Sequence, residues 1–187
     1  MGRQNWKPGT MINPLPAVLV TCAAGGRSNM LTVAWAGTVC TNPPMCSISI
    51  RPERFSYDLI KESMEFTINL TTEDMARATD WAGVRSGRDY DKWAETGLTA
   101  VKGEKVGCPY IAESPLAIEC RVRQIVSLGS HDMFLADVVN VIADDTLIDA
   151  ESGAFRLDKA RLISYSHGAY YRTGEEIGRF GFSVKKN

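Results

Sequence analysis

One short segment of the chain, Cys46 to Ile50, alternates apolar and hydroxyl-bearing side chains without a break. Successive side chains of a β-strand point to opposite faces, so this segment is predicted to be a strand with its apolar face against a core. The other face presents Ser47 and Ser49 either to solvent or to a bound ligand. The segment therefore indicates β-structure and leaves open a role as the wall of a site.

Other β-prone runs recur along the chain, separated by glycine, proline and asparagine. Strands are predicted over residues 17–22, 31–36, 45–50, 65–70, 116–127, 133–143 and 160–165. The two long strands, 116–127 and 133–143, are expected to form a hairpin. Strands grouped in this way, with few helices between them, favour a mainly β barrel over a doubly wound sheet. The length of 187 residues fits one domain over residues 1–187.

Three short helices are predicted around this β-structure. One covers residues 57–63 with Ser56 as its N-cap, because a serine hydroxyl can accept a hydrogen bond from the first turn. A second covers residues 72–81 with Glu73 in its first turn, where the helix dipole favours an acidic side chain. A third lies around residues 89–94, within a polar, glycine-containing stretch that is long enough to be a functional loop.

Composition and charge exclude several classes of partner. The hydrophobic content of 44% and charged content of 23% are ordinary for a soluble globular protein. A formal net charge of −1 gives no reason to expect nucleic acid or an anionic membrane. The five cysteines show no CxxC spacing and are expected to be reduced, buried thiols of a cytoplasmic protein. Small molecules and other protein chains are the partners that remain.

Several common active-site motifs are absent. The chain contains neither the GxGxxG loop of dinucleotide-binding folds nor the GxxxxGK[ST] loop that cradles nucleotide phosphates. The GxSxG elbow of serine hydrolases is also missing. The two histidines, His131 and His167, are far apart in the sequence and not spaced with any cysteine pair, so no metal site is expected.

A series of short motifs runs in order through nearly the whole chain. They are Asn29-x-x-Thr32-x-x-Trp35, Asn42-Pro43-Pro44, Ser49-Ile50-Arg51, Arg54-Phe55-Ser56, Phe66-Thr67-Ile68-Asn69-Leu70, Asp91-Lys92-Trp93, Gly129-Ser130-His131-Asp132-Met133-Phe134 and Gly178-Arg179-Phe180-Gly181-Phe182-Ser183. Together they resemble the FMN-binding split barrel of flavin reductase-like proteins and, more narrowly, its flavoredoxin branch. The resemblance implies a six-stranded, mainly antiparallel Greek-key split β-barrel with peripheral helices, FMN as cofactor and a homodimer.

The same resemblance assigns residues to the ribityl-phosphate part of the flavin. It implies that Asn29, Thr32 and Trp35 contact this part and that Arg54 and Ser56 hold the phosphate. The assignment agrees with chemistry, because a phosphate is bound well by a guanidinium together with the donors of a helix N-terminus. The alternatives are a surface role for Arg54, a turn role for Asn29 and a core role for Trp35.

Further residues are assigned to the flavin ring. The resemblance implies that the ring runs along a strand end formed by Ser49, Ile50 and Arg51. Lys92 would reach the phosphate or the ring from its loop, and Tyr165 would either cover the flavin or pack the end of the barrel. His131 is the candidate catalytic residue, beside the flavin and a nicotinamide; alternatively, it is a turn histidine paired with Asp132. Ala136-Asp137 departs from the glycine-acidic pair that similar reductases carry there.

Two functions follow from the resemblance. One is an NAD(P)H-dependent flavin oxidoreductase, with NADH or NADPH as a substrate whose nicotinamide must be aligned with the flavin. The other is a flavoredoxin-like carrier that keeps FMN tightly bound and passes electrons to a partner protein. A flavin-binding protein without turnover is a third possibility. The motifs do not choose between NADH and NADPH.

Overall fold

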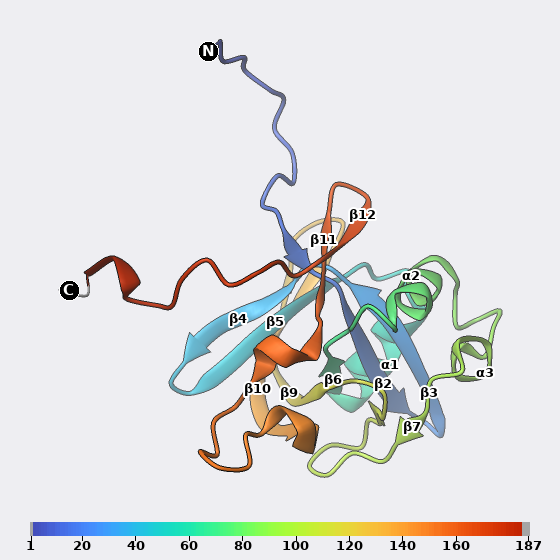
Figure 1. The fold of residues 1–187 in the computed structure, drawn as a ribbon. Coiled ribbons are helices and arrows are strands. Elements are labelled where there is room, and N and C mark those ends of the chain that lie inside the picture. Colours follow the sequence, from blue (N-terminus) through green and yellow to red (C-terminus); the bar gives the residue numbers. More distant parts are fainter. Residues whose placement is uncertain (1, 185–187) are drawn as a thin grey trace.

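The structure is a computed structural model, and it describes residues 2–184. Its main element is a seven-stranded antiparallel sheet in the order β3-β2-β6-β9-β10-β5-β4 (Figure 1). The strands are β2 (Val18–Ala24), β3 (Arg27–Val33), β4 (Ala36–Thr41), β5 (Pro44–Ile50), β6 (Glu65–Asn69), β9 (Leu116–Ser127) and β10 (Asp132–Ala143). The outer strands β3 and β4 do not pair with each other in residues 2–184, so the barrel is split.

Two smaller sheets and a few short helices complete the fold. The smaller sheets are formed by β1 (Leu15–Pro16), β11 (Ile163–Ser166) and β12 (Ala169–Arg172), and by β7 (Ala100–Val101) and β8 (Tyr110–Ile111). The helices are α1 (Phe55–Ser63), α2 (Ala76–Val84) and α3 (Lys92–Thr96), with 3₁₀ turns at Asp145–Leu147, Leu157–Ala160 and Phe182–Val184. The helices α1 and α2 both pack against β2 and β3, which places them beside the same edge of the sheet.

The main core lies between the curved sheet and α1. Its fully buried side chains include Phe66, Phe134 and Ile48, none of which has surface accessible to water. Ile48 and its neighbours on β5 follow the predicted alternation, with buried apolar residues and half-buried serines in turn. Cys46 belongs to this core, as expected, and its Sγ lies 3.4 Å from the Sγ of Cys120. All five cysteines are free thiols.

The predicted fold class and the β9–β10 hairpin are confirmed, whereas the strand number is wrong. The strands that were not predicted are the two-residue strands β1, β7 and β8, the strand β4, which follows directly after β3, and β12, which lies in the tail that gave no pattern. Most side chains of β4 are exposed, and so are two of the four in β12. An exposed strand lacks the alternation of buried and polar residues on which sequence-based detection depends.

Two helix starts differ from the prediction because tertiary contacts use the residues that were expected to begin them. The helix α1 begins at Phe55 with Arg54 as its N-cap, and Ser56 lies inside the helix, where its hydroxyl accepts a hydrogen bond from Asn29. The helix α2 begins at Ala76, and Glu73 lies before it, paired with two arginines near the β11–β12 hairpin. The third helix, α3, begins three residues later than predicted.

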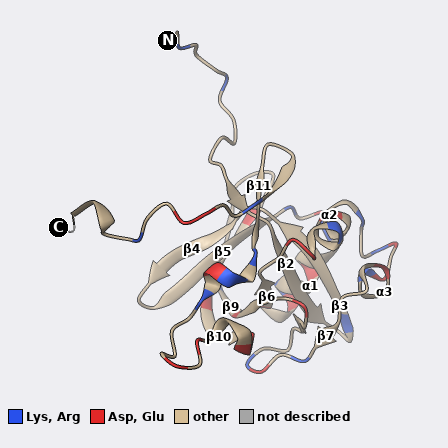
Figure 2. Cartoon of the chain, viewed as in Figure 1, with Lys and Arg blue, Asp and Glu red and all other residues tan. Residues whose placement is uncertain are grey.

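The distribution of charge follows the fold. Figure 2 shows Lys, Arg, Asp and Glu on helices, loops and several strands, including β3, whereas the strands β4 and β5 carry none. Both chain ends leave the body of the protein as extended segments (Figure 1). These segments expose several large apolar side chains, namely Trp6, Met11, Ile12, Ile177, Phe180, Phe182 and Val184.

Candidate functional site

Two adjacent pockets lie between the sheet, the start of α1 and the helix α2. Their volumes are about 840 Å³ and about 410 Å³. They share five lining residues, namely Leu31, Thr32, Arg51, Arg54 and Gly83. The shared wall makes them two parts of one site, here called the ring pocket (the larger) and the phosphate pocket (the smaller).

The phosphate pocket is strongly basic. Its lining contains five cationic side chains and one acidic one, namely Arg51, Arg54, Arg85, Arg88, Lys92 and Glu53. The first turn of α1 also lines it, through Phe55 and Ser56. The backbone N–H groups at a helix start have no partner within the helix and carry the positive end of its dipole. Such a pocket suits an anion, and a phosphate in particular.

Asn29 and Ser56 form a buried hydrogen bond at the floor of the phosphate pocket. The Asn29 Nδ2 atom donates to the Ser56 Oγ atom at 2.7 Å, and both side chains are almost fully buried. The bond ties β3 to the first turn of α1. A side chain at Gly87 would collide with Asn29 and Phe55, so only glycine fits where this loop closes over the pocket.

Lys92 is the one buried cation of the phosphate pocket. It is 4% exposed, and its Nζ donates a hydrogen bond to the Ala82 carbonyl at 2.6 Å. Burial, with the charge of Arg54 nearby, lowers the pKa of Lys92 from 10.5 to about 8. An anion that binds beside the amine favours its charged form and raises this pKa again.

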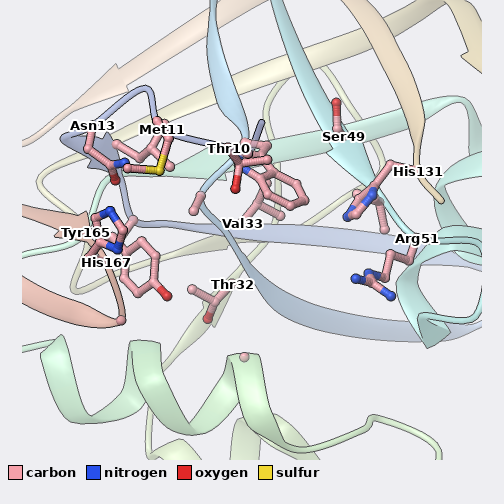
Figure 3. Close-up of a pocket in the computed structure, with 18 of the residues that line it drawn as sticks. Thr10, Met11, Asn13, Thr32, Val33, Ser49, Arg51, His131, Tyr165 and His167 are labelled. Atoms are coloured by element: carbon pink, nitrogen blue, oxygen red, sulfur yellow. The ribbon is translucent and has the colours of Figure 1, made fainter. Parts of the chain in front are cut away.

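The ring pocket brings together residues from β3, β5 and the β9–β10 turn. The Trp35 and His131 rings meet edge to face, with their centroids 4.5 Å apart. The Ser130 hydroxyl lies 2.9 Å from Nδ1 of His131. Burial and the nearby charge of Arg51 lower the pKa of His131, which favours its neutral form. Figure 3 shows His131 and Arg51 together at one end of this pocket.

Asp132 holds the turn that carries His131 in place through two hydrogen bonds. Tyr57 of α1 and Ser127 of β9 each donate a hydrogen bond to the Asp132 carboxylate at 2.6 Å. The hydrogen bonds from Ser127 and Tyr57 lower the pKa of Asp132, which keeps it ionised. Asp132 therefore pairs with these hydroxyls, and the described hydrogen bonds show none between it and His131.

The β11–β12 hairpin forms the opposite end of the ring pocket. Tyr165 and Tyr170 stack edge to face with centroids 5.6 Å apart, and the Tyr170 hydroxyl donates to Asp80 of α2 at 3.2 Å. Burial and the charge of Asp80 raise the pKa of Tyr170 to about 12. His167, at the tip of the hairpin, also lines the pocket and lies with Tyr165 in Figure 3.

The residues singled out from the sequence fall into the two pockets. Those in the phosphate pocket alone are Asn29, Ser56 and Lys92; those in the ring pocket alone are Trp35, Ser49, Ile50, His131 and Tyr165; those in both are Thr32, Arg51 and Arg54. Trp35 lies at the ring end beside His131, and the Thr32 hydroxyl donates to the Thr79 carbonyl.

Several lining residues were missed by sequence reasoning. Arg85 and Arg88 belong to a polar loop that was expected to lie at the surface in solvent. Asp80 belongs to a helix that contains no recognisable motif. His167 was considered only as a metal ligand. The structure brings both histidines into one pocket, although 36 positions of sequence separate them.

Within residues 2–184, no His, Cys, Asp or Glu side chains are grouped so that they could hold a metal ion. None of the helices in that range is long and apolar enough to cross a membrane.

A split β-barrel that joins a basic pocket at a helix start to a larger pocket with aromatic walls has the shape and charge that suit a planar ligand with an anionic tail. Comparison with known proteins agrees with that class. The chain matches the flavin reductase like domain over residues 11–173 and therefore belongs to the flavin reductase-like family.

Solved structures and sequence relatives refine this assignment. The chain resembles the flavoredoxin of Desulfovibrio vulgaris (Miyazaki F), with 30% identity, a TM-score of 0.91 and coverage of 98% of this chain and 100% of that chain. It also resembles an FMN-binding protein from Thermus thermophilus determined with bound 1-cyclohex-2-enone (26% identity, TM-score 0.79, coverage 96% and 98%). An uncharacterized Aeropyrum pernix protein is 33% identical over 156 residues, which are 83% of this chain and 58% of that protein. The predicted flavoredoxin branch is confirmed.

Proposed function

We propose that the chain binds FMN, with the phosphate in the phosphate pocket and the isoalloxazine ring in the ring pocket. The continuity of the two pockets carries this proposal, because it supplies both an anion site and a wide cavity for a ring system. The residues present fit the cofactor. The start of α1, Arg54 and the Asn29–Ser56 pair suit a phosphate, and β5 offers a wall for a flat ring. The Thermus thermophilus protein, which binds FMN by its description, supports the choice of cofactor.

The activity that we propose is oxidoreduction between NADH or NADPH and flavin. FMN held in the site would supply one-electron and two-electron chemistry. The protein's own groups position the reactants. Arg51 and Arg54 neutralise the anionic tail, and Trp35 and His131 form an aromatic wall at one end of the ring pocket. Neutral His131 has one ring nitrogen beside Ser130, which leaves the other for a hydrogen bond to a ligand.

A single preparation tests the cofactor and the activity. The purified protein is expected to show the absorption of bound flavin, or to acquire it when FMN is added, and NADH or NADPH should bleach that absorption without oxygen. A protein that neither contains nor takes up flavin would refute the binding proposal. A flavin that stays oxidised with both nicotinamides would refute the reductase activity.

A second function, that of an electron carrier with permanently bound FMN, is favoured by the likeness to flavoredoxin over nearly the whole length of both chains. A carrier should keep its flavin through dialysis, whereas an enzyme that releases reduced flavin should lose it. Chemical reduction without nicotinamide, followed by reoxidation with an added one-electron protein acceptor, would support the carrier. Complete loss of flavin on dialysis would exclude it.

We also propose that the protein is a homodimer. The edge strand β4 is exposed and uncharged, and such an edge is prone to pair with another chain unless it is covered. The extended chain ends add exposed apolar groups, of which Ile12 is 85% and Ile177 is 96% exposed. A second copy would cover these surfaces. Light scattering coupled to size-exclusion chromatography should give the mass of two chains, and a mass of 20.6 kDa would contradict the proposal.

A further inference from the structure

The tip of the β11–β12 hairpin contains a histidine in an unusual backbone conformation. The strands are joined by two residues, His167 and Gly168, with φ angles of 49° and 86°. Positive φ at both central positions is the geometry of a type I′ turn, which strongly favours Asn, Asp or Gly at the first of them. Histidine adopts this conformation less readily than glycine does, although it does so more often than most other residues. The turn itself therefore does not explain why a histidine is present.

Packing does not explain His167 either. Its side chain is exposed, and none of the hydrogen bonds or salt bridges found within residues 2–184 involves the imidazole. The residue nevertheless lines the ring pocket, at the end opposite His131 (Figure 3). A residue held in a disfavoured conformation without internal contacts, on the wall of a pocket, indicates a role toward a ligand.

Tyr165 offers a second donor on the same wall. Its hydroxyl likewise takes part in no hydrogen bond found within the described residues, and its ring is half-buried against Tyr170. Figure 3 shows the Tyr165 and His167 side chains beside each other. Together they present a phenol and an imidazole, both of which can donate a hydrogen bond to an oxygen.

The hairpin is held rigidly enough to act as a recognition wall. On one side Tyr165 pairs with Leu15 of β1, and on the other Tyr170 is bonded to Asp80 of α2. At its base, Glu73 forms salt bridges with Arg161 at 2.9 Å and with Arg172 at 3.0 Å. Groups on rigid elements specify ligands more accurately than groups on free loops do.

We propose that His167 and Tyr165 form a subsite for the second ligand, and that they bind a carbonyl or carboxylate oxygen on a planar ring. This inference rests on the proposed function, because the ligand would lie beside a flavin in the same pocket. His131 and Arg51 line the other end of the pocket, so the two ends present different groups to a ligand. The subsite makes His167 a specificity-determining residue for the partner that exchanges electrons with the flavin.

The test uses three small probes on the FMN-loaded protein: nicotinamide, nicotinate and pyridine. They share a six-membered ring and differ in carrying a carboxamide, a carboxylate or neither. Binding is followed by the change in flavin absorption. The wild-type protein should bind nicotinamide or nicotinate more tightly than pyridine by roughly 2- to 10-fold, the effect of one net hydrogen bond. Whichever of the two binds more tightly identifies the oxygen group.

The variant His167→Gly separates recognition from folding, because glycine has no side-chain donor. Glycine is favoured at this turn position, so the variant should melt close to the wild-type temperature and should load FMN equally well. Its preference for nicotinamide or nicotinate over pyridine should fall, because only the Tyr165 donor remains. Tyr165→Phe, which keeps the stacked ring, should lower the preference too, whereas Tyr171→Phe, outside the pocket, should leave it unchanged.

The outcomes are distinguishable from failure of the proposed function. If the protein takes up no FMN, the proposed function fails before any probe is added. If FMN is loaded and His167→Gly keeps the wild-type preference, the subsite is refuted while FMN binding stands. Loss of the dimer in His167→Gly, measured by light scattering, would also refute the subsite, because the imidazole would then serve an interface.

Discussion

Raising the pH from 7 to 9 should weaken FMN binding through the neutralisation of Lys92. The amine is 4% exposed and lines the phosphate pocket with four arginines. Its pKa in the ligand-free protein is lowered to about 8, first by burial and then by the charge of Arg54. A bound phosphate dianion favours the charged amine and raises this pKa again. Above pH 8, binding therefore requires the uptake of a proton.

The size of the effect follows from the fraction of charged Lys92. With a pKa of about 8, roughly 90% of the lysine is charged at pH 7 and roughly 10% at pH 9. If only the charged form binds the phosphate well, the affinity should fall about tenfold, or about 1.4 kcal/mol. The phosphate contributes little, because the second ionisation of a phosphate monoester is near pH 6 and is already roughly 90% complete at pH 7.

The assay is the quenching of FMN fluorescence when ligand-free protein is added, at constant ionic strength because salt screens charge pairs. Lys92→Arg, which stays charged, should remove the pH dependence. Lys92→Met should bind more weakly at pH 7 and show no further loss at pH 9. Lys159→Met, outside both pockets, is the matched control and should behave as the wild type. A tenfold fall in FMN affinity between pH 7 and pH 9 that persists in Lys92→Met would refute the role of Lys92. An FMN affinity of the wild type that does not change with pH would refute it too.

Stability should respond to pH in the opposite direction. The folded pKa of Lys92 lies below its unfolded value, so between pH 8 and 10.5 the unfolded chain holds more protons than the folded chain. The cost of burying the charged amine is present below pH 8 and disappears as the pH rises through this window, an effect on the order of 3 kcal/mol at most. Urea unfolding of the ligand-free wild type and of Lys92→Met at pH 7 and pH 10 measures the difference.

Three further variants test the phosphate pocket. Arg54→Ala should weaken FMN binding by roughly 10- to 100-fold because a charged hydrogen bond to the phosphate is lost, whereas Arg77→Ala, in helix α2 but outside both pockets, should not. Ser56→Ala should lower the free energy of unfolding by about 1–3 kcal/mol, because the buried Asn29 amide loses its acceptor; an unchanged urea midpoint would contradict this. Gly87→Ala should cost about 1–3 kcal/mol and also weaken FMN binding, because the new methyl group meets Asn29; equal flavin loading would argue against it.

The parts of the fold that sequence predicted are those in which burial and pattern coincide. The segment Cys46 to Ile50 is a strand because its alternation matches a buried and a half-buried face. The strand β4 was missed because its exposed side chains carry no such pattern. The start of α2 was misplaced because Glu73 is used by arginines from a distant segment, and a residue's long-range partner cannot be read from its local sequence.

The candidate site shows the same division. Motif resemblance brought Asn29, Ser56 and Lys92 to attention, and the structure gathers them in one pocket. The burial of Lys92 could not be predicted, because it arises from the packing of α3 against α2 and β3. His167 was not recognised, since only the folded hairpin places it at the ring pocket. Residue types can suggest a chemistry, but their joint position depends on strand pairing over long sequence distances.

The helix α1 connects the two ends of the site. Its first turn lines the phosphate pocket through Ser56, and Tyr57, the next residue, donates to Asp132 beside His131. The anion site and the turn that carries His131 are therefore fixed by consecutive residues of one buried helix turn. A displacement of this turn would move both groups together, so the distance between them is set by the fold. For a ligand with an anionic tail and a reactive ring, that fixed spacing aligns the ring once the tail is bound.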